Sequence, residues 1–203
     1  MFEDPTAVRI HVELQEIEPR IWRRLVVPIN FSLAHLHHII QAAFGWQDAH
    51  LHQFDIGGLR FGDAEFMEAE RIDHAEPRMF EAAAVKLEDF SFREGEGLEF
   101  SYVYDFGDHW VHRVRLEEQL VINPAPKKAE CIEGARACPP EDVGGPHGYA
   151  KFLRILLDPA DHERDEQKSL KVWSGGKFHP TTFDLARTNK AVRGALRRHQ
   201  YLK

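Results

Sequence analysis

The feature that most constrains the fold of this chain is a pair of apolar runs with a period of two, one on each side of a short polar segment. The residues that keep this period are Leu98, Phe100, Tyr102 and Tyr104 before the segment, and Trp110, His112, Val114 and Leu116 after it. A period of two is typical of half-buried β-strands. Because the apolar residues occupy even positions in both runs, a two-residue turn at 106–107 would send them to opposite faces. The pattern predicts an antiparallel hairpin with a three- or five-residue connection or a bulge, in which Gly107 adopts a positive φ.

Other segments show the periods of strands and helices. The predicted strands cover 8–14, 21–27 and 50–56, and the predicted helices cover 33–44, 149–157 and 182–202. Ser32 is expected to cap the first helix and Gly45 to end it, and Gly57-Gly58 is a favoured two-residue hairpin turn. The sequence therefore predicts an α+β fold, with a mixed or antiparallel sheet from the N-terminal half packed with helices and a mainly helical C-terminal part.

A length of 203 residues suits one domain, which we expect to span 1–203. Within it, residues 121–148 are rich in proline, glycine and cysteine and predict an irregular loop, and the acidic residues 62–84 predict a surface excursion. The N-terminus lacks the pattern of a signal peptide, and no apolar run is long enough to cross a membrane. The sequence therefore predicts a soluble cytoplasmic protein.

The charge of the chain limits the partners that it can bind. A net charge of −7 disfavours broad nucleic-acid binding, which requires many Lys and Arg side chains at the phosphates. The predicted C-terminal helix is the exception, since six basic residues and no acidic residue lie between positions 187 and 203. We therefore expect a protein, a peptide or a small ligand as the partner, with any DNA contact confined to this helix.

Histidines cluster between positions 35 and 52 of the chain. On a helical wheel, His37 falls at the edge of the apolar face, whereas His35 and His38 fall on the opposite side. We expect these three histidines to occupy surface and boundary positions and not to converge. His50 and His52 share one side of a predicted strand, a spacing from which both could reach one metal but which is common in proteins.

The polar segment of the hairpin, YDFGDHWVH, has two interpretations. In the first, Asp105 and Asp108 accept hydrogen bonds from turn amides, and Tyr104 and Trp110 belong to the core. In the second, the aromatic side chains line a pocket in which Asp105, Asp108 and His112 hold a metal or transfer protons. The sequence leaves both interpretations open.

A second dense segment, CIEGARACPPEDVGGPHGY, contains both cysteines of the chain. Cys131 and Cys138 are seven positions apart, which is longer than the Cys-x-x-Cys step of a zinc knuckle. With His112 or His147 they would form a zinc site if the fold brings them together. Otherwise they are expected to be free thiols.

These two segments carry a resemblance to a known family. YDFGDHWVHRVRLE followed by CIEGARACPPEDVGGPHGYAKFL resembles the Ri-plasmid open-reading-frame-three-like family, some members of which are labelled transposon passenger TnpR-family proteins. LHHIIQAAFGWQDAHLHQF resembles the helix-then-strand segment of the same family. The resemblance implies one compact α+β domain. Many relatives carry a further cysteine where this chain has Val143, which weakens the case for a cysteine-based metal site.

The residues give no support to a recombinase. No serine of the chain lies in an arginine-rich setting, as a serine recombinase requires, and Tyr201 lies two positions from the C-terminal residue, Lys203. The sequence also contains no Walker loop, nucleophile elbow, His-Glu-x-x-His helix or dinucleotide fingerprint. No enzyme class is predicted from motifs.

Two functions are consistent with these features. The first is a non-catalytic binding or adaptor protein associated with mobile genetic elements, with an acidic and aromatic surface at 104–112 and 139–149. Its expected contact residues are Tyr104, Trp110, Glu141, Asp142 and Tyr149. The second is a metal-dependent hydrolase that uses Asp105, Asp108 and His112. A DNA-binding accessory role of the C-terminal helix ranks third.

Overall fold

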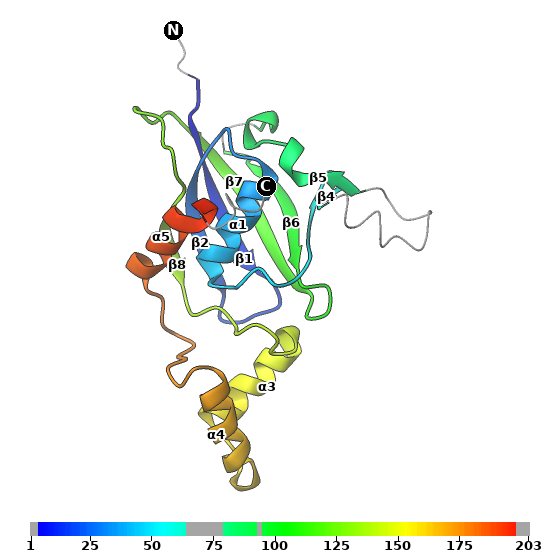
Figure 1. Cartoon of the computed structure of the whole chain (residues 1–203), viewed down its shortest axis with the longest axis vertical. Helices are drawn as coiled ribbons and strands as arrows, with labels where there is room; N and C mark the ends of the chain where they lie inside the picture. Colours follow the sequence, from blue (N-terminus) through cyan, green and yellow to red (C-terminus); the bar gives the residue numbers. More distant parts are fainter. Residues whose placement is uncertain (1–3, 64–78, 93–94, 198–203) are drawn as a thin grey trace.

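The computed structural model describes residues 4–63, 79–92 and 95–197, which form a mixed β-sheet with helices on one of its faces and at one end (Figure 1). The strands are β1 (Ala7–Leu14), β2 (Ile21–Pro28), β3 (His52–Ile56), β4 (Leu59–Gly62), β5 (Met79–Glu81), β6 (Leu98–Tyr104), β7 (Trp110–Leu120) and β8 (Glu130–Ala135). Within the described ranges the sheet has the order β5-β4-β3-β6-β7-β1-β2-β8, and only β4 and β5 pair in parallel. The predicted α+β fold is confirmed.

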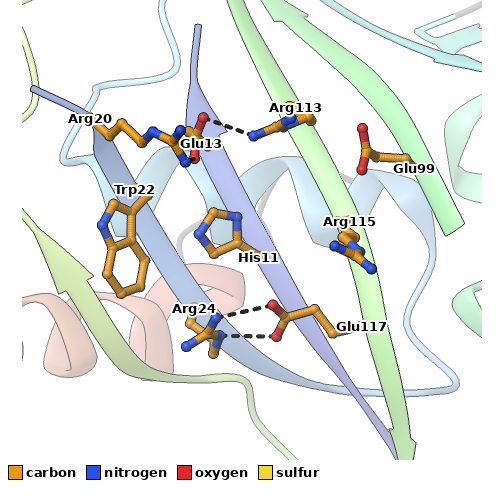
Figure 2. A pocket seen from close by; sticks show the side chains of 9 residues that line it. All are labelled: His11, Glu13, Arg20, Trp22, Arg24, Glu99, Arg113, Arg115 and Glu117. Carbon is orange, nitrogen blue, oxygen red and sulfur yellow. Dashed lines mark hydrogen bonds and ion pairs between the residues drawn. The ribbon is translucent and has the colours of Figure 1, made fainter. Parts of the chain in front are cut away.

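The two faces of the sheet differ in polarity because successive side chains of a strand point to opposite faces. In β1, Val8, Ile10 and Val12 are fully buried and belong to the hydrophobic core beneath helix α1. His11 and Glu13 point to the other face, which carries charged side chains and faces solvent (Figure 2). One face of the sheet is therefore the core and the other is an open polar surface.

Helix α1 (Leu33–Phe44) covers the core face. The Ser32 side chain accepts a hydrogen bond from the backbone amide of His35, and Gly45 ends the helix with a φ of 87°. Both caps agree with the prediction, since serine satisfies a free amide at the N-terminus and glycine adopts the left-handed conformation without strain.

The β6–β7 hairpin has a five-residue connection, residues 105–109, with Tyr104 paired to Trp110, which is one of the alternatives that the sequence predicted. The expectation for Gly107 is wrong, because the residues with positive φ are Asp105, at 57°, and His109, at 55°. The Asp105 carboxylate accepts hydrogen bonds from the amides of Gly107 and Asp108, at 2.9 and 3.2 Å. Aspartate tolerates the left-handed conformation when its side chain bonds to the following backbone.

The region predicted as one irregular loop, 121–148, contains strand β8, which pairs with β2 at the edge of the sheet. The expectation of a loop throughout is therefore wrong. The strand was not visible in the sequence because it is short and interrupted by a bulge opposite Arg24 and Leu25, which breaks the period of two.

The helices of the C-terminal part form two groups. The three helices are α3 (Gly145–Leu157), α4 (Arg164–Trp173) and α5 (Leu185–Gly194). Helices α3 and α4 pack together and project from the end of the sheet near the 105–109 turn, whereas α5 lies beside α1 and β8 (Figure 1). The predicted basic helix is shorter than expected, because α5 ends at Gly194 and a 3₁₀ turn (Ala195–Arg197) follows; residues 198–203 lie outside the described residues.

Three further 3₁₀ turns connect the elements, Ala82–Ala84, Leu87–Asp89 and Asp161–Glu163. Most of the predicted acidic excursion, residues 64–78, lies outside the described residues. Among the helices of the described ranges, none is long and apolar enough to cross a membrane.

Arg23 joins the end of α1 to the edge of the sheet. Its guanidinium donates hydrogen bonds to four backbone carbonyl groups, those of Trp22, Ala43, Ala135 and Arg136. The side chain is 3% exposed and lies between the rings of Phe44 and Phe183, whose centroids are 5.0 and 4.5 Å from the guanidinium carbon. This contact positions α1, and with it the histidines of that helix, on the sheet.

Candidate metal centre

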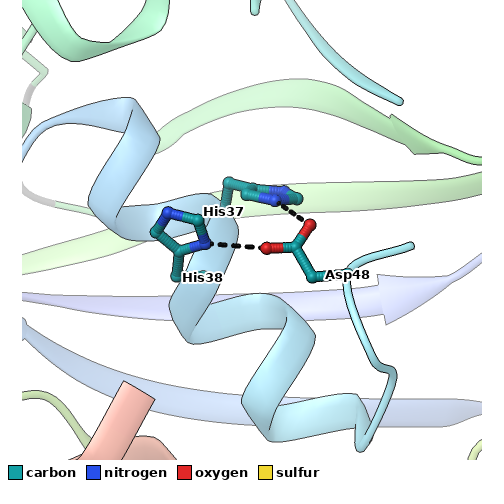
Figure 3. A group of neighbouring side chains, drawn as sticks. All are labelled: His37, His38 and Asp48. Carbon is teal, nitrogen blue, oxygen red and sulfur yellow. Dashed lines mark hydrogen bonds and ion pairs between the residues drawn. The ribbon is translucent and has the colours of Figure 1, made fainter. Parts of the chain in front are cut away.

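His37, His38 and Asp48 form a compact group on helix α1 and the loop that follows it (Figure 3). His37 Nε2 lies 2.6 Å from Asp48 Oδ1, and His38 Nδ1 lies 3.0 Å from Asp48 Oδ2. One potential ligand atom from each residue lies within 4.8 Å of the other two. Two imidazoles and a carboxylate are ligands of zinc and of other divalent transition metals.

The loop after α1 returns Asp48 to the helix that it has just left. Trp46 Nε1 donates a hydrogen bond to the carbonyl oxygen of Pro139, at 3.1 Å. The backbone amide of Gln47 donates to both carboxylate oxygens of Glu141, at 3.0 and 3.1 Å. Asp48 then adopts a φ of 60°. These anchors place the carboxylate of Asp48 between the two imidazoles.

A second set of contacts orients the imidazole of His37. Its Nδ1 lies 2.8 Å from the hydroxyl oxygen of Tyr102, which in turn accepts a hydrogen bond from Gln41 Nε2, at 2.9 Å. His37, Gln41 and Tyr102 are all buried. A histidine that binds a metal through one ring nitrogen is commonly fixed by a hydrogen bond at the other. The Tyr102 hydroxyl forms such a hydrogen bond at Nδ1 of His37, which leaves Nε2 to face Asp48.

His52 packs against the same histidine from strand β3. The rings of His37 and His52 are stacked, with centroids 3.5 Å apart and planes inclined by 9°. Burial, together with the neighbouring His37, lowers the pKa of His52 to about 2, so this imidazole is neutral at neutral pH. Among the described residues, its Nε2 is buried without a hydrogen-bond partner.

The charge of Asp48 is stabilised by the two imidazoles. Burial alone would raise the pKa of this carboxyl, but the hydrogen bonds from His37 and His38 outweigh burial and hold the pKa far below its usual value. Asp48 is therefore ionised at all ordinary pH values, as a metal ligand must be.

A second group of potential ligands lies at the turn of the hairpin. His50 Nε2 is 3.2 Å from Asp142 Oδ1 and 3.6 Å from Asp105 Oδ2. Asp142 is 72% exposed on its side chain, so this group is more open to solvent than the one on α1. The chain segment 48–52 thus contributes Asp48 to one group, His50 to the other and His52 to the stack.

The structure separates the three residues proposed from the sequence as catalytic. Asp105 belongs to the group with His50, whereas Asp108 Oδ2 accepts a hydrogen bond from the amide of Gly144, at 3.0 Å. His112 is fully buried, with its Nδ1 3.2 Å from the carbonyl oxygen of Trp110. Burial lowers the pKa of His112 to about 3. Asp105 and Asp108 therefore accept hydrogen bonds from backbone amides at the turn, and His112 lies in the core.

The aromatic residues expected on a docking surface are buried. Tyr104, Trp110 and Tyr149 are 0, 1 and 2% exposed. The Tyr104 hydroxyl donates a hydrogen bond to Glu141 Oε1, at 2.7 Å, which connects the hairpin to the 139–145 loop. Of the five residues expected to contact a partner, only Glu141 and Asp142 reach the surface.

The cysteines do not take part in either ligand group. Cys131 is buried and Cys138 is partly buried, and both are free thiols. Burial raises the pKa of Cys131 to about 11 and raises that of Cys138 further. In the part of the chain that the structure describes, neither ligand group contains Cys131, Cys138, His112 or His147.

The expectation that the α1 histidines do not converge is wrong for His37 and His38, whereas His35 does not belong to the group and its Nδ1 lies 2.8 Å from the Ser32 hydroxyl oxygen. His37 is 3% exposed, and both His37 and His38 contact Asp48. The helical wheel places the two Cβ atoms in different directions, but it does not show a loop that inserts a carboxylate between the rings. The density of histidines from 35 to 52 was the one signal in the sequence.

Comparison with known proteins agrees with the fold and the resemblance. A relative from Sinorhizobium fredii (strain NBRC 101917 / NGR234), "Uncharacterized protein y4hQ", is 35% identical over 191 residues, which cover 92% of this chain and 91% of the relative. The crystal structure of the "Protein of Unknown Function MM3350 from Methanosarcina mazei Go1" is similar with a TM-score of 0.73 and 33% identity, over 89% of this chain and 95% of that one. The family described as "Plasmid pRiA4b ORF-3-like protein" matches residues 6–187. The chain therefore belongs to the plasmid pRiA4b ORF-3-like family.

Proposed function

We propose that the protein binds a divalent transition metal ion through His37, His38 and Asp48 and that the bound ion activates water for hydrolysis. The observation that supports this proposal is the convergence of three ligand atoms, two imidazole nitrogens and a carboxylate oxygen, within 4.8 Å of one another. Catalytic zinc sites use three protein ligands of these types and keep a further position for water.

The contacts around the group resemble the surroundings of a metal ligand. Asp48 is ionised, and His37 is oriented by the Tyr102 hydroxyl at its other nitrogen. A metal ion would take over the interactions that now join each imidazole to the carboxylate, and its binding would release any proton on the coordinating nitrogens.

Solvent can reach part of the site. The side chains of His38 and Asp48 are 22 and 21% exposed, whereas His37 is 3% exposed. An ion held at the boundary between core and solvent can bind a water molecule on its outer side. Held by His37, His38 and Asp48, such an ion would lower the pKa of a bound water toward neutrality and so would supply a nucleophile for hydrolysis.

The proposal retains the hydrolase hypothesis drawn from the sequence but assigns it to other residues. Docking of a partner at 104–112 and 139–149 remains a prediction, and the buried positions of Tyr104, Trp110 and Tyr149 leave Phe106 as an exposed aromatic side chain beside the acidic ones. Association with mobile elements likewise remains a prediction from the resemblance.

The first experiment is a calorimetric titration of untagged, chelator-treated protein with Zn²⁺. Mn²⁺ and Fe²⁺ are titrated in parallel. We expect one ion per chain for the preferred metal. His38→Ala and Asp48→Asn should each weaken that affinity at least about tenfold. His162→Ala is the matched control, because His162 is exposed on a distant 3₁₀ turn and should not change the affinity.

Two outcomes would contradict the proposal. Less than a stoichiometric amount of every metal, or an affinity that Asp48→Asn leaves unchanged, would exclude the site. The hydrolytic part is tested separately with p-nitrophenyl esters and phosphates. If the protein binds the metal tightly but hydrolyses none of these esters and phosphates in a metal-dependent way, it is a metal-binding protein and the proposed hydrolase activity is excluded.

A further inference from the structure

The open face of the sheet contains a groove of about 370 Å³ (Figure 2). It lies across β1, β2, β6 and β7, on the opposite side of the sheet from helix α1 and the metal centre. The strand register arranges its side chains in two rows. One row contains Trp22, Glu13 and Arg113, and the next contains Arg24, His11 and Arg115. The volume is in the range of small-molecule sites.

Among the residues that line the groove, arginines outnumber glutamates by one, on a chain of net charge −7. Four arginines and three glutamates line it. The carboxylate of Glu13 is shared between Arg113, at 3.0 Å, and Arg20, at 3.6 Å. Arg24 pairs with both Glu117 and Glu133. Of the four arginines, only Arg115 therefore has no ion pair within the described residues.

Arg115 is the cation with the weakest compensation. Its guanidinium Nη2 lies 3.4 Å from the carbonyl oxygen of Glu96. Glu99 is opposite Arg115 in the β6–β7 register, but within the described residues Arg115 forms no ion pair shorter than 4.0 Å. A planar guanidinium group without a carboxylate partner is suited to bind a phosphate or carboxylate group of a ligand.

An aromatic platform lies beside these arginines. The rings of His11 and Trp22 are stacked, with centroids 5.2 Å apart and planes inclined by 27°. The guanidinium carbon of Arg24 lies 5.5 Å from the centre of the Trp22 ring. Trp22 is only partly buried, so part of this platform faces the groove. Exposed aromatic rings beside arginines bind planar rings by stacking.

We propose that this groove binds a small ligand of the nucleoside monophosphate class, with its base on the exposed side of the stacked Trp22–His11 pair and its phosphate on Arg115. The platform matches a planar ring, and the guanidinium of Arg115, which has no ion pair within the described residues, matches the phosphate. A long polynucleotide fits less well, because the charge of the whole chain is negative and would repel phosphates beyond the groove.

The test is calorimetry of the full chain with AMP at low salt, with adenosine and inorganic phosphate as separate arms. AMP should bind at least about tenfold more tightly than either fragment, because the ring and the phosphate each contribute. Arg115→Ala and Trp22→Leu should each weaken AMP binding about tenfold or more. Circular dichroism and thermal unfolding will verify that both variants fold.

Arg164→Ala is the matched control, since Arg164 is exposed on helix α4 and bonds to Asp161, away from the groove. It should leave the AMP affinity unchanged. Absence of AMP binding at millimolar concentration would overturn the proposal. Equal affinity for AMP and inorganic phosphate would overturn it too, because the platform would then not contribute. An AMP affinity that neither groove variant changes would assign the ligand to another site.

Discussion

The imidazole rings of His37 and His52 lie face to face, with their centroids 3.5 Å apart. A stack this close is favourable when at most one ring is charged. The low pKa of His52, about 2, meets this condition. His37 is therefore held on three sides, by the His52 ring, by the Tyr102 hydroxyl at Nδ1 and by Asp48 at Nε2. It is the most constrained residue of the proposed metal centre.

Tyr102→Phe should weaken metal binding without changing a ligand. The substitution removes the hydroxyl that lies 2.8 Å from His37 Nδ1 and that accepts from Gln41. We expect a loss of about tenfold in affinity and about 1 kcal/mol in the free energy of unfolding, since the Gln41 amide loses its partner. Tyr149→Phe is the control, because Tyr149 lies on helix α3, where its ring packs against Phe152 and Phe178. Equal metal affinity in Tyr102→Phe and the native protein would contradict the orienting role.

Acid should destabilise the protein through His112. Burial lowers the pKa of His112 from 6.5, its value in the unfolded chain, to about 3 in the folded protein. Below pH 6.5 the unfolded state therefore binds a proton at His112 that the folded state does not bind. The contribution of His112 is fully present above pH 6.5 and is lost as the pH falls toward 3. Between pH 6.5 and about pH 5 the expected loss is about 2 kcal/mol.

Urea unfolding as a function of pH measures this loss. His112→Leu should reduce the slope of the curve in that interval, because no proton is then taken up at this position, and the low pKa of His52 maintains the rest of the slope. If the native protein and His112→Leu show the same slope, the acid sensitivity comes from other groups. Asp48 affects the pH dependence of stability only below pH 3.8, the ordinary pKa of aspartate. Its pKa in the folded protein is lower than that, so its stabilising effect is lost only in stronger acid.

Arg23→Met should cost about 3 kcal/mol or more, because four backbone carbonyl groups, one of them fully buried and three partly buried, lose their donor at once. Methionine retains most of the contact with Phe44 and Phe183, so the effect reports the hydrogen bonds rather than the packing. Arg20→Met is the comparison, since Arg20 is 63% exposed and has one ion pair, with Glu13; its effect should stay below about 1 kcal/mol. Similar urea midpoints for the two variants would argue against the structural role of Arg23.

Gly145→Ala should destabilise the junction between the hairpin and helix α3 more than Gly144→Ala does. Both glycines have positive φ, at 67° and 92°. A Cβ on Gly145 would lie 2.3 Å from the carbonyl oxygen of Asp108, whereas a Cβ on Gly144 meets only Gly148 Cα, at 3.5 Å. Strain alone costs about 1 kcal/mol, so the additional loss in Gly145→Ala measures the close contact. Equal unfolding free energies would show that the loop moves to accommodate the methyl group.

Local patterns were sufficient for much of the fold. The α+β class and helix α1 with its caps follow from apolar periods and local end signals, and the parity of the apolar positions limits the hairpin to a three- or five-residue connection or a bulge. These features depend on residues that are neighbours in the sequence. Strand β8 could not be predicted in this way, because its bulge interrupts the period and its pairing partner, β2, is distant in the chain.

The sites were decided by tertiary structure. The sequence singled out Asp105, Asp108 and His112 because they are close along the chain, but burial places His112 in the core and the turn separates the two carboxylates. His37, His38 and Asp48 come together only because the loop after α1 is held by Pro139 and Glu141, which are far away in the sequence. Composition showed that histidines and acids were present, and long-range contacts determined which of them meet.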